Sequence, residues 1–284
     1  MNGANMNDHT IAELLQAARA TDPATAIAAI QRLGVLKAPE AAPVILARIT
    51  DGDPAIRKVC TGECVDILGP DAVSLLEGRL LDSVIEIGMT AAQALAYAGT
   101  AKAAEVLIRA ASNSETVISV HGSYGLGFWT SRDGFKVMLR AIVKGNDVCR
   151  GDVALALGRI GAPDALPLLK IAFHSEIDEE NRLKIATAQT LLGNDKKEFI
   201  RQVLRSGESR LQYAALACVE LVKDKGALFD ILPLLGSSNC ELSAAAAATL
   251  EKIGLLLPEK KEFSRDEKAK LWLSFMIPPG YTVS

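Results

Sequence analysis

The chain has 284 residues, and because 49% of them are hydrophobic it can bury a sizeable core without disulfides or metal ions to support it. Its 31 basic and 34 acidic residues give a net charge of -3. This balance argues against nucleic-acid binding, since a phosphate-binding groove needs a concentrated excess of Lys and Arg. Aromatic residues contribute only 5% while Ala and Leu recur throughout, which favours an all-α protein over a β-sheet protein.

Residues 1–8 are polar and are predicted to form a disordered leader, after which a first helix begins at residue 9. They lack the basic segment and the apolar segment that are typical of a signal peptide. No stretch of the chain approaches the ~18 consecutive apolar residues that cross a membrane. The five cysteines form an odd set without a CxxC motif, which suits a reducing compartment. We therefore expect a cytoplasmic protein.

From residue 22 onward the chain repeats a unit of two helices. The clearest copy, CRGDVALALGRIGAPDALPLLKIA, covers 149–172, and two others cover 53–81 and 83–111. Asp-Pro pairs at 22–23 and 53–54 predict helix starts, because Asp caps the free N–H groups and Pro suits the first helical position. A glycine expected to end one helix of a unit recurs at Gly34, Gly69, Gly99, Gly161, Gly193 and Gly254. The intervals predict a period of roughly 31 residues and two units whose glycine has been replaced.

These repeats resemble the HEAT-like repeat family, in particular the short repeats of bilin-lyase-type proteins. Arg57 and Arg150 occupy the family's Arg position, while Gly158 and Gly161 occupy its two Gly positions. The resemblance spans about residues 21–255 and implies a right-handed α-α superhelix, a HEAT-like solenoid of about eight helix pairs. It does not imply bilin chemistry, because such repeats occur mostly in binding and scaffolding proteins.

The repeats predict a single solenoid over 9–276 that is closed by capping helices at both ends. At the C-terminal end, the sequence PEKKEFSRDEKAKLWLSFM is amphipathic and suits a helix that shields the last repeat from water. Residues 277–284 are predicted to be a tail, because Pro278 and Pro279 cannot continue a helix.

The fourth unit, ETVISVHGSYGLGFWTSRDGF, departs furthest from the pattern. Gly122, Gly125 and Gly127 lie in a predicted helix interior, where Ala would be more stable by about 0.5–1 kcal/mol each. Aromatic residues gather beside them in a chain that is otherwise poor in aromatics. One interpretation is a recess that receives a partner; the other is that glycine makes room for the aromatic side chains in the core.

Polar and aromatic residues on the glycine-ended helices are the candidates for partner binding. They are His121, Tyr124, Trp129, Tyr97, Gln93, Arg150 and Arg159. For Arg57 and Arg150 a structural role is the alternative, because an Arg at this position can pair with an Asp of an adjacent turn and hold two repeats together. The wider set of polar residues on these helices also includes Glu63 and Glu220, and its charges of both signs suit a mixed protein surface.

The chain shows no motif for catalysis, for a cofactor or for a metal. Its three histidines are far apart, and GSYGLG at 122–127 has neither a preceding strand nor a following Gly-Lys-Ser. We therefore expect a non-enzymatic interaction or scaffold module that presents a concave groove to a protein or peptide, and not to a membrane, a nucleic acid or a small molecule. The family resemblance suggests an alternative function, that of a bilin-lyase-type or chaperone-like subunit acting on a partner protein.

Overall fold

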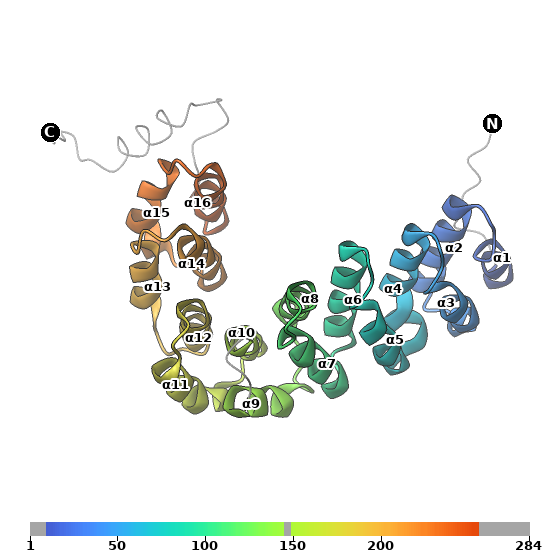
Figure 1. Cartoon of the computed structure of the whole chain (residues 1–284), viewed down its shortest axis with the longest axis horizontal. Helices are drawn as coiled ribbons and strands as arrows, with labels where there is room; N and C mark the ends of the chain where they lie inside the picture. The colour runs from blue at the N-terminus through green and yellow to red at the C-terminus, as the bar shows by residue number, and fades with distance from the viewer. Residues whose placement is uncertain (1–9, 145–148, 256–284) are drawn as a thin grey trace, which may run out of the picture. The chain divides into compact units, whose positions relative to one another are not determined.

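The computed structural model describes residues 10–144 and 149–255, and these residues form helices joined by turns (Figure 1). The chain divides into two compact units, Met1–Ile160 and Gly161–Ser284, which are described separately below. Consecutive helices pair, from α1 with α2 to α15 with α16, so the described residues contain eight helix pairs. The predicted all-α helical-repeat architecture is confirmed.

Unit 1 is built from two layers of helices (Figure 1). Its helices are α1 (Ile11–Ala17), α2 (Pro23–Val35), α3 (Ala42–Arg48), α4 (Pro54–Leu68), α5 (Ala72–Arg79), α6 (Ile85–Ala98), α7 (Ala101–Ala111), α8 (Thr116–Gly127), α9 (Phe135–Lys144) and α10 (Arg150–Ile160). Helices α2, α4, α6, α8 and α10 pack side by side, and we call them the even layer. Helices α5, α7 and α9 likewise pack in sequence in the odd layer, and the small residues between neighbours allow this stacking.

The helices begin as the Asp-Pro pairs predict. Asp22 accepts a hydrogen bond from the backbone N–H of Thr25 at 2.8 Å, and Asp53 accepts one from Ala55 at 2.7 Å. Pro23 is the first residue of α2, where the missing N–H costs no hydrogen bond. The local sequence therefore sets where these helices begin.

The glycine-ended turns are confirmed at five positions and corrected at one. Gly69, Gly99, Gly161, Gly193 and Gly254 all have positive φ, which glycine adopts without strain. Gly34 was expected to end its helix, but it lies buried inside α2, and Lys37 takes the positive φ of 50° instead. Lys223, also at φ 50°, replaces the glycine after α14. With these two lysines included, the positive-φ residues at the ends of the even-numbered helices recur every 30 to 32 residues, except where the fourth pair lacks one; Gly207, in the turn before α14, also has positive φ.

Bidentate Arg–Asp pairs connect neighbouring repeats. In unit 1 the Arg57 side chain donates to both carboxylate oxygens of Asp82, at 3.0 Å each, across the boundary between repeats. Arg201 donates in the same way to Asp224, at 2.8 Å for both bonds, in unit 2. The structural role considered for Arg57 is therefore the one the contacts show, because a bidentate pair fixes orientation as well as distance.

Unit 2 repeats the same architecture. Its helices are α11 (Leu166–Ser175), α12 (Glu179–Leu191), α13 (Lys197–Leu204), α14 (Ser209–Val222), α15 (Leu228–Leu235) and α16 (Cys240–Lys252). Helix α14 packs against both α12 and α16, and each of these contacts the preceding helix of its own pair. The side chains of Ile200, Leu216, Ile231 and Leu250 are almost fully buried in one hydrophobic core.

The predicted leader at 1–8, the helix expected to cap the C-terminal end within 256–276 and the tail at 277–284 all lie outside the described residues. Within 10–144 and 149–255, no helix is both long enough and apolar enough to cross a membrane.

Candidate functional site

Four side chains recur at the same position of successive even-layer helices in unit 1. Asp66, Tyr97, Phe128 and Arg159 lie at the C-terminal ends of α4, α6, α8 and α10, each 31 residues after the one before. A second row, one helical turn earlier, consists of Gly62, Gln93, Tyr124 and Leu155. Because residues four apart share a helix face, the two rows lie on the same side of the layer.

Aromatic side chains occupy the middle of these rows. Tyr97 is 63% exposed and Phe128 is 46% exposed, although large aromatics are normally buried. The rings of Tyr124 and Phe128 pack edge to face with centroids 4.8 Å apart, so each fixes the orientation of the other. We call Gln93, Tyr97, Tyr124 and Phe128 the aromatic face.

Several of the residues predicted to bind a partner lie at or beside this face. Gln93 and Tyr97 are exposed on α6, Tyr124 is partly exposed on α8, and Arg159 is exposed at the end of α10. Arg150 is the first residue of α10 and is partly buried. Their part in binding stays a prediction. Phe128, one of the aromatic residues beside the glycines but not among those predicted to bind a partner, also belongs to the exposed set.

His121 and Trp129 were also predicted to bind a partner, but both are fully buried. His121 donates from Nδ1 to the carbonyl of Leu80 at 3.0 Å, because a carbonyl can only accept. Trp129 donates from Nε1 to the carbonyl of Ser131 at 2.7 Å. Neither side chain reaches the surface: His121 links the interior of α8 to the C-terminal end of α5, and Trp129 closes the turn that follows α8.

The glycines of the fourth unit bring α8 close to its neighbours. A Cβ at Gly122 would overlap the backbone of Ala111, and one at Gly125 would lie 2.8 Å from the carbonyl oxygen of Ala92. Glycine at these positions allows α8 to approach both α7 and α6 closely. The backbone of Ala111 and the side chain of Leu107, and not the aromatic rings, occupy the space that side chains at Gly122 and Gly125 would need, while the aromatic face nearby remains exposed.

A carboxylate outside the seven residues predicted to bind a partner lies at the edge of the face. Glu63 on α4 occupies the position taken by Ala94, Gly125 and Ala156 in the following repeats, where only small buried residues occur. Its carboxylate fits because Gly34 on α2 has no Cβ in that space. An alignment of the repeats could have revealed it as a charge among small core residues.

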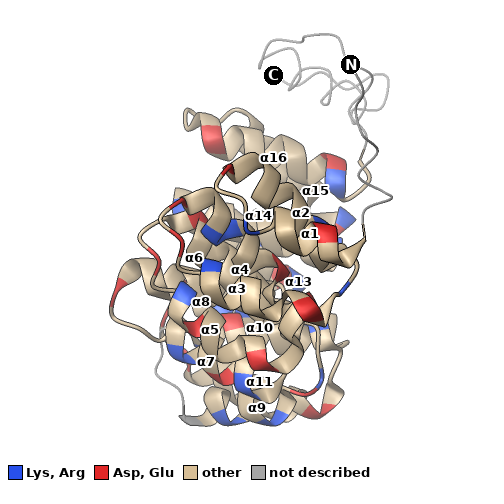
Figure 2. Ribbon diagram, turned by 90° about the vertical axis from the view of Figure 1, so that its right-hand side faces the viewer, with Lys and Arg blue, Asp and Glu red and all other residues tan. Residues whose placement is uncertain are grey.

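The carboxylates near the face differ in their electrostatics. Burial, with a smaller contribution from nearby Asp66, raises the pKa of Glu63. The Asp66 carboxylate accepts from the Tyr97 hydroxyl at 3.3 Å and pairs with Lys37, also at 3.3 Å. Figure 2 shows that acidic and basic residues are otherwise interspersed along the helices.

Cys60 and Cys64, two of the buried thiols, are poorly placed to react. Burial raises the pKa of Cys60 and of Cys64 to about 12, so both are protonated at neutral pH. Among residues 10–144 and 149–255, no group of three or more His, Cys, Asp or Glu side chains is placed to hold a metal ion.

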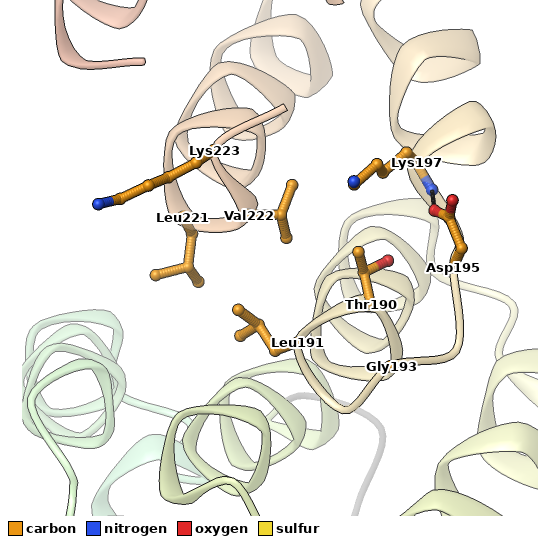
Figure 3. Close-up of a pocket in the computed structure, with 8 residues that line it drawn as sticks. All are labelled: Thr190, Leu191, Gly193, Asp195, Lys197, Leu221, Val222 and Lys223. Atoms are coloured by element: carbon orange, nitrogen blue, oxygen red, sulfur yellow. Dashed lines mark hydrogen bonds between the residues drawn. The ribbon is translucent and has the colours of Figure 1, made fainter. Parts of the chain in front are cut away.

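Unit 2 contains a pocket of about 430 Å³ between the C-terminal ends of α12 and α14 (Figure 3). Thr190 and Leu221, which line it, continue the 31-residue row of Asp66 and Tyr97. In Figure 3 the Lys197 ammonium points toward the space beside Thr190, whereas Lys223 points away from it. Lys223 suits its position at the C-cap of α14 because the C-terminal ends of helices carry partial negative charge, whereas Lys197 is the first residue of α13.

The fold defines a helical-repeat protein. Residues 11–96 match the family model of HEAT repeats, so the predicted HEAT-like repeats are confirmed, and α1 to α6 consist of such repeats. Among curated protein sequences, none matches this chain significantly.

Several solved structures are similar to the chain. One is the complex of CpcE and CpcF of phycocyanin lyase from Nostoc sp. PCC7120, with 18% identity over 97% of this chain and 97% of that chain and a TM-score of 0.41. Two engineered proteins follow, one with 17% identity over 86% of this chain and 78% of its own, TM-score 0.36. The other has 19% identity over 86% of this chain and 96% of its own, with a TM-score of 0.29. These likenesses assign no function to this chain.

Proposed function

We propose that the chain is a non-enzymatic interaction module that binds a protein or peptide through the aromatic face of unit 1. The observation that carries this proposal is the exposure of Tyr97 and Phe128 at matching positions of adjacent helices. Aromatic side chains dominate the energetics of protein interfaces because they bury a large area with few rotatable bonds. Exposing two of them to water has no benefit for folding.

The composition of the face supports a protein partner. Gln93 supplies an exposed amide beside the rings, and carboxylates lie at one end of the rows while Arg159 lies at the other. An aromatic centre with a polar rim is the usual anatomy of a protein interface. A nucleic acid would require a concentrated positive charge, and the charges around this face have both signs. We also propose that the protein acts in the cytoplasm, where its cysteines stay reduced.

The test compares proteins captured by the tagged wild-type chain and by Tyr97→Ala with Phe128→Ala, in cells that naturally make it. We expect the double variant to lose a discrete partner while keeping its helical circular dichroism, because both side chains are largely exposed. The matched control is Ile171→Ala with Phe229→Ala, which removes exposed apolar side chains from α11 and α15.

The control variant should retain the partner. If both double variants retain it, or if both lose it, the aromatic face is not the binding surface. A large fall in melting temperature for Tyr97→Ala with Phe128→Ala would instead assign the two rings to folding.

A further inference from the structure

Glu63 is placed where the repeat normally has a small core residue. The carboxylate is partly buried between α4 and α2, yet it forms no hydrogen bond or ion pair with any described residue. Taking an ionised carboxylate out of water without a partner is costly. Its position at a core register is therefore unfavourable for folding alone, and a cation supplied from outside would offset the cost.

Open surface lies one residue before Glu63 on the same helix. Gly62 is exposed on α4, at the position taken by Gln93 and Tyr124 in the next two repeats. A Cβ at Gly62 would meet no atom nearer than Cγ2 of Thr90, at 3.7 Å, so the surface over this residue is open. A long side chain from a partner can lie there without displacing any atom of the chain.

The groups around this space suit a positive charge. Asp66 lies one turn after Gly62, with its side chain 25% exposed, and the Tyr97 ring is held toward it by the hydroxyl-to-carboxylate hydrogen bond. Lys37 pairs with Asp66, but the Lys37 side chain is 66% exposed. Such a surface pair contributes little free energy, so Lys37 can move aside or share the carboxylate.

Resting on the proposed function, we infer that the partner segment carries a Lys or Arg next to an apolar residue. The basic group lies between Glu63 and Asp66, its aliphatic stem lies over Gly62, and the apolar neighbour packs on Tyr97 and Phe128. Lys and Arg suit this arrangement because their stems cover apolar surface while the charged end reaches an anion. A cation beside the Tyr97 ring also gains from the negative face of the ring.

The experiment selects ligands without assuming their sequence. A phage library of random linear peptides is panned against the full chain, with Tyr97→Ala and Phe128→Ala as the counter-selection target. Enriched peptides are synthesised with a fluorophore, and their Kd is measured by fluorescence anisotropy against the wild type and the variants. Thermal melts recorded by circular dichroism show that each variant is folded.

We expect the enriched peptides to share a Lys or Arg adjacent to an aromatic or aliphatic residue. Glu63→Gln with Asp66→Asn should weaken their binding by about tenfold or more, because the charge partner is lost. Glu105→Gln with Asp133→Asn removes the same charge from exposed sites, one of them on the odd-layer helix α7, and should leave the Kd unchanged. Gly62→Gln, which introduces the residue of the next repeat, should weaken binding without lowering the melting temperature.

Two results would overturn the inference in distinguishable ways. Enriched peptides that lack basic residues, or that bind the Glu63→Gln and Asp66→Asn variant as tightly as the wild type, would refute the basic ligand and leave the aromatic face as the binding surface. If no enriched peptide depends on Tyr97 and Phe128, both the inference and the proposed function fail.

Discussion

Gly88 on α6 and His121 on α8 interlock, and the substitution Gly88→Ala tests whether they do. The His121 ring occupies the space where a Cβ of residue 88 would lie, and the ring is fully buried and held by Leu80. The added methyl therefore overlaps a side chain that cannot move to solvent. Overpacking of this kind costs about 1–3 kcal/mol, whereas Ala in place of Gly in a helix gains about 1 kcal/mol. Because the ring is fully buried, the cost of overpacking should lie in the upper part of this range, at about 2–3 kcal/mol, and we expect the free energy of unfolding to fall by about 1–2 kcal/mol.

Gly62→Ala is the matched control, because it makes the same change in an adjacent helix of the same layer. A Cβ there would be in ordinary contact with Thr90 only, so the helix gains about 0.5–1 kcal/mol with no clash. The same substitution is thus expected to raise the free energy of unfolding at position 62 and to lower it at position 88. His121→Ala should make Gly88→Ala less harmful than it is alone, because removal of the ring leaves room for the methyl.

The assay is urea unfolding followed by the fluorescence of Trp129, which is buried in unit 1. All variants carry Trp272→Phe, so that Trp129 is the single tryptophan. The midpoint and slope give the free energy of unfolding in each case. The reasoning is refuted if Gly88→Ala is as stable as the reference, or if the effects of Gly88→Ala and His121→Ala are simply additive.

Three further predictions follow from the packing and the pKa shifts. Gly122→Ala places a methyl against the backbone of Ala111, which cannot rotate away. It should therefore lower the free energy of unfolding more than Gly88→Ala does, and it should speed hydrogen exchange in α7 and α8. Unchanged exchange would contradict the close approach of these helices. At neutral pH, native protein should react rapidly with a maleimide at Cys240 alone, because the other four thiols are buried; a second rapid thiol in mass spectrometry would disagree. Hydrogen bonds from Arg57 lower the pKa of Asp82. The ionised carboxylate therefore stabilises the fold fully above pH ~4 and progressively less as the pH falls through the lowered pKa. The urea midpoints of the wild type and Asp82→Asn should converge in acid, and a difference that stays constant with pH would refute this prediction.

The repeat architecture could be predicted because its signals are local. The Asp-Pro pairs fix helix starts through hydrogen bonds within a few residues, and Gly69 and Gly99 fix turns through their own φ. Gly34 was misassigned because glycine also serves close packing. Lys37 shows that a turn can be placed by the helices around it, at a residue with no intrinsic preference for positive φ.

The site could be predicted only in part, because burial depends on neighbouring helices. Tyr97 and Gln93 could be assigned to an exposed face from helical spacing alone. The burial of His121 follows from the absence of a side chain at Gly88, a residue in another repeat. The same holds for Glu63, whose position depends on Gly34. Such pairs are visible in the sequence only when repeats are aligned and adjacent helices are compared.

Photo-crosslinking tests the binding role of the aromatic face most directly. A benzoyl-phenylalanine at position 93 lies between Tyr97 and Tyr124 on the face, while one at position 105 lies on α7 in the odd layer. On irradiation of cells that naturally make the protein, we predict a discrete protein adduct from position 93, none from position 105, and loss of the adduct when Tyr97→Ala and Phe128→Ala are added. Equal adducts from both positions, or an adduct at position 93 that survives these substitutions, would contradict the account.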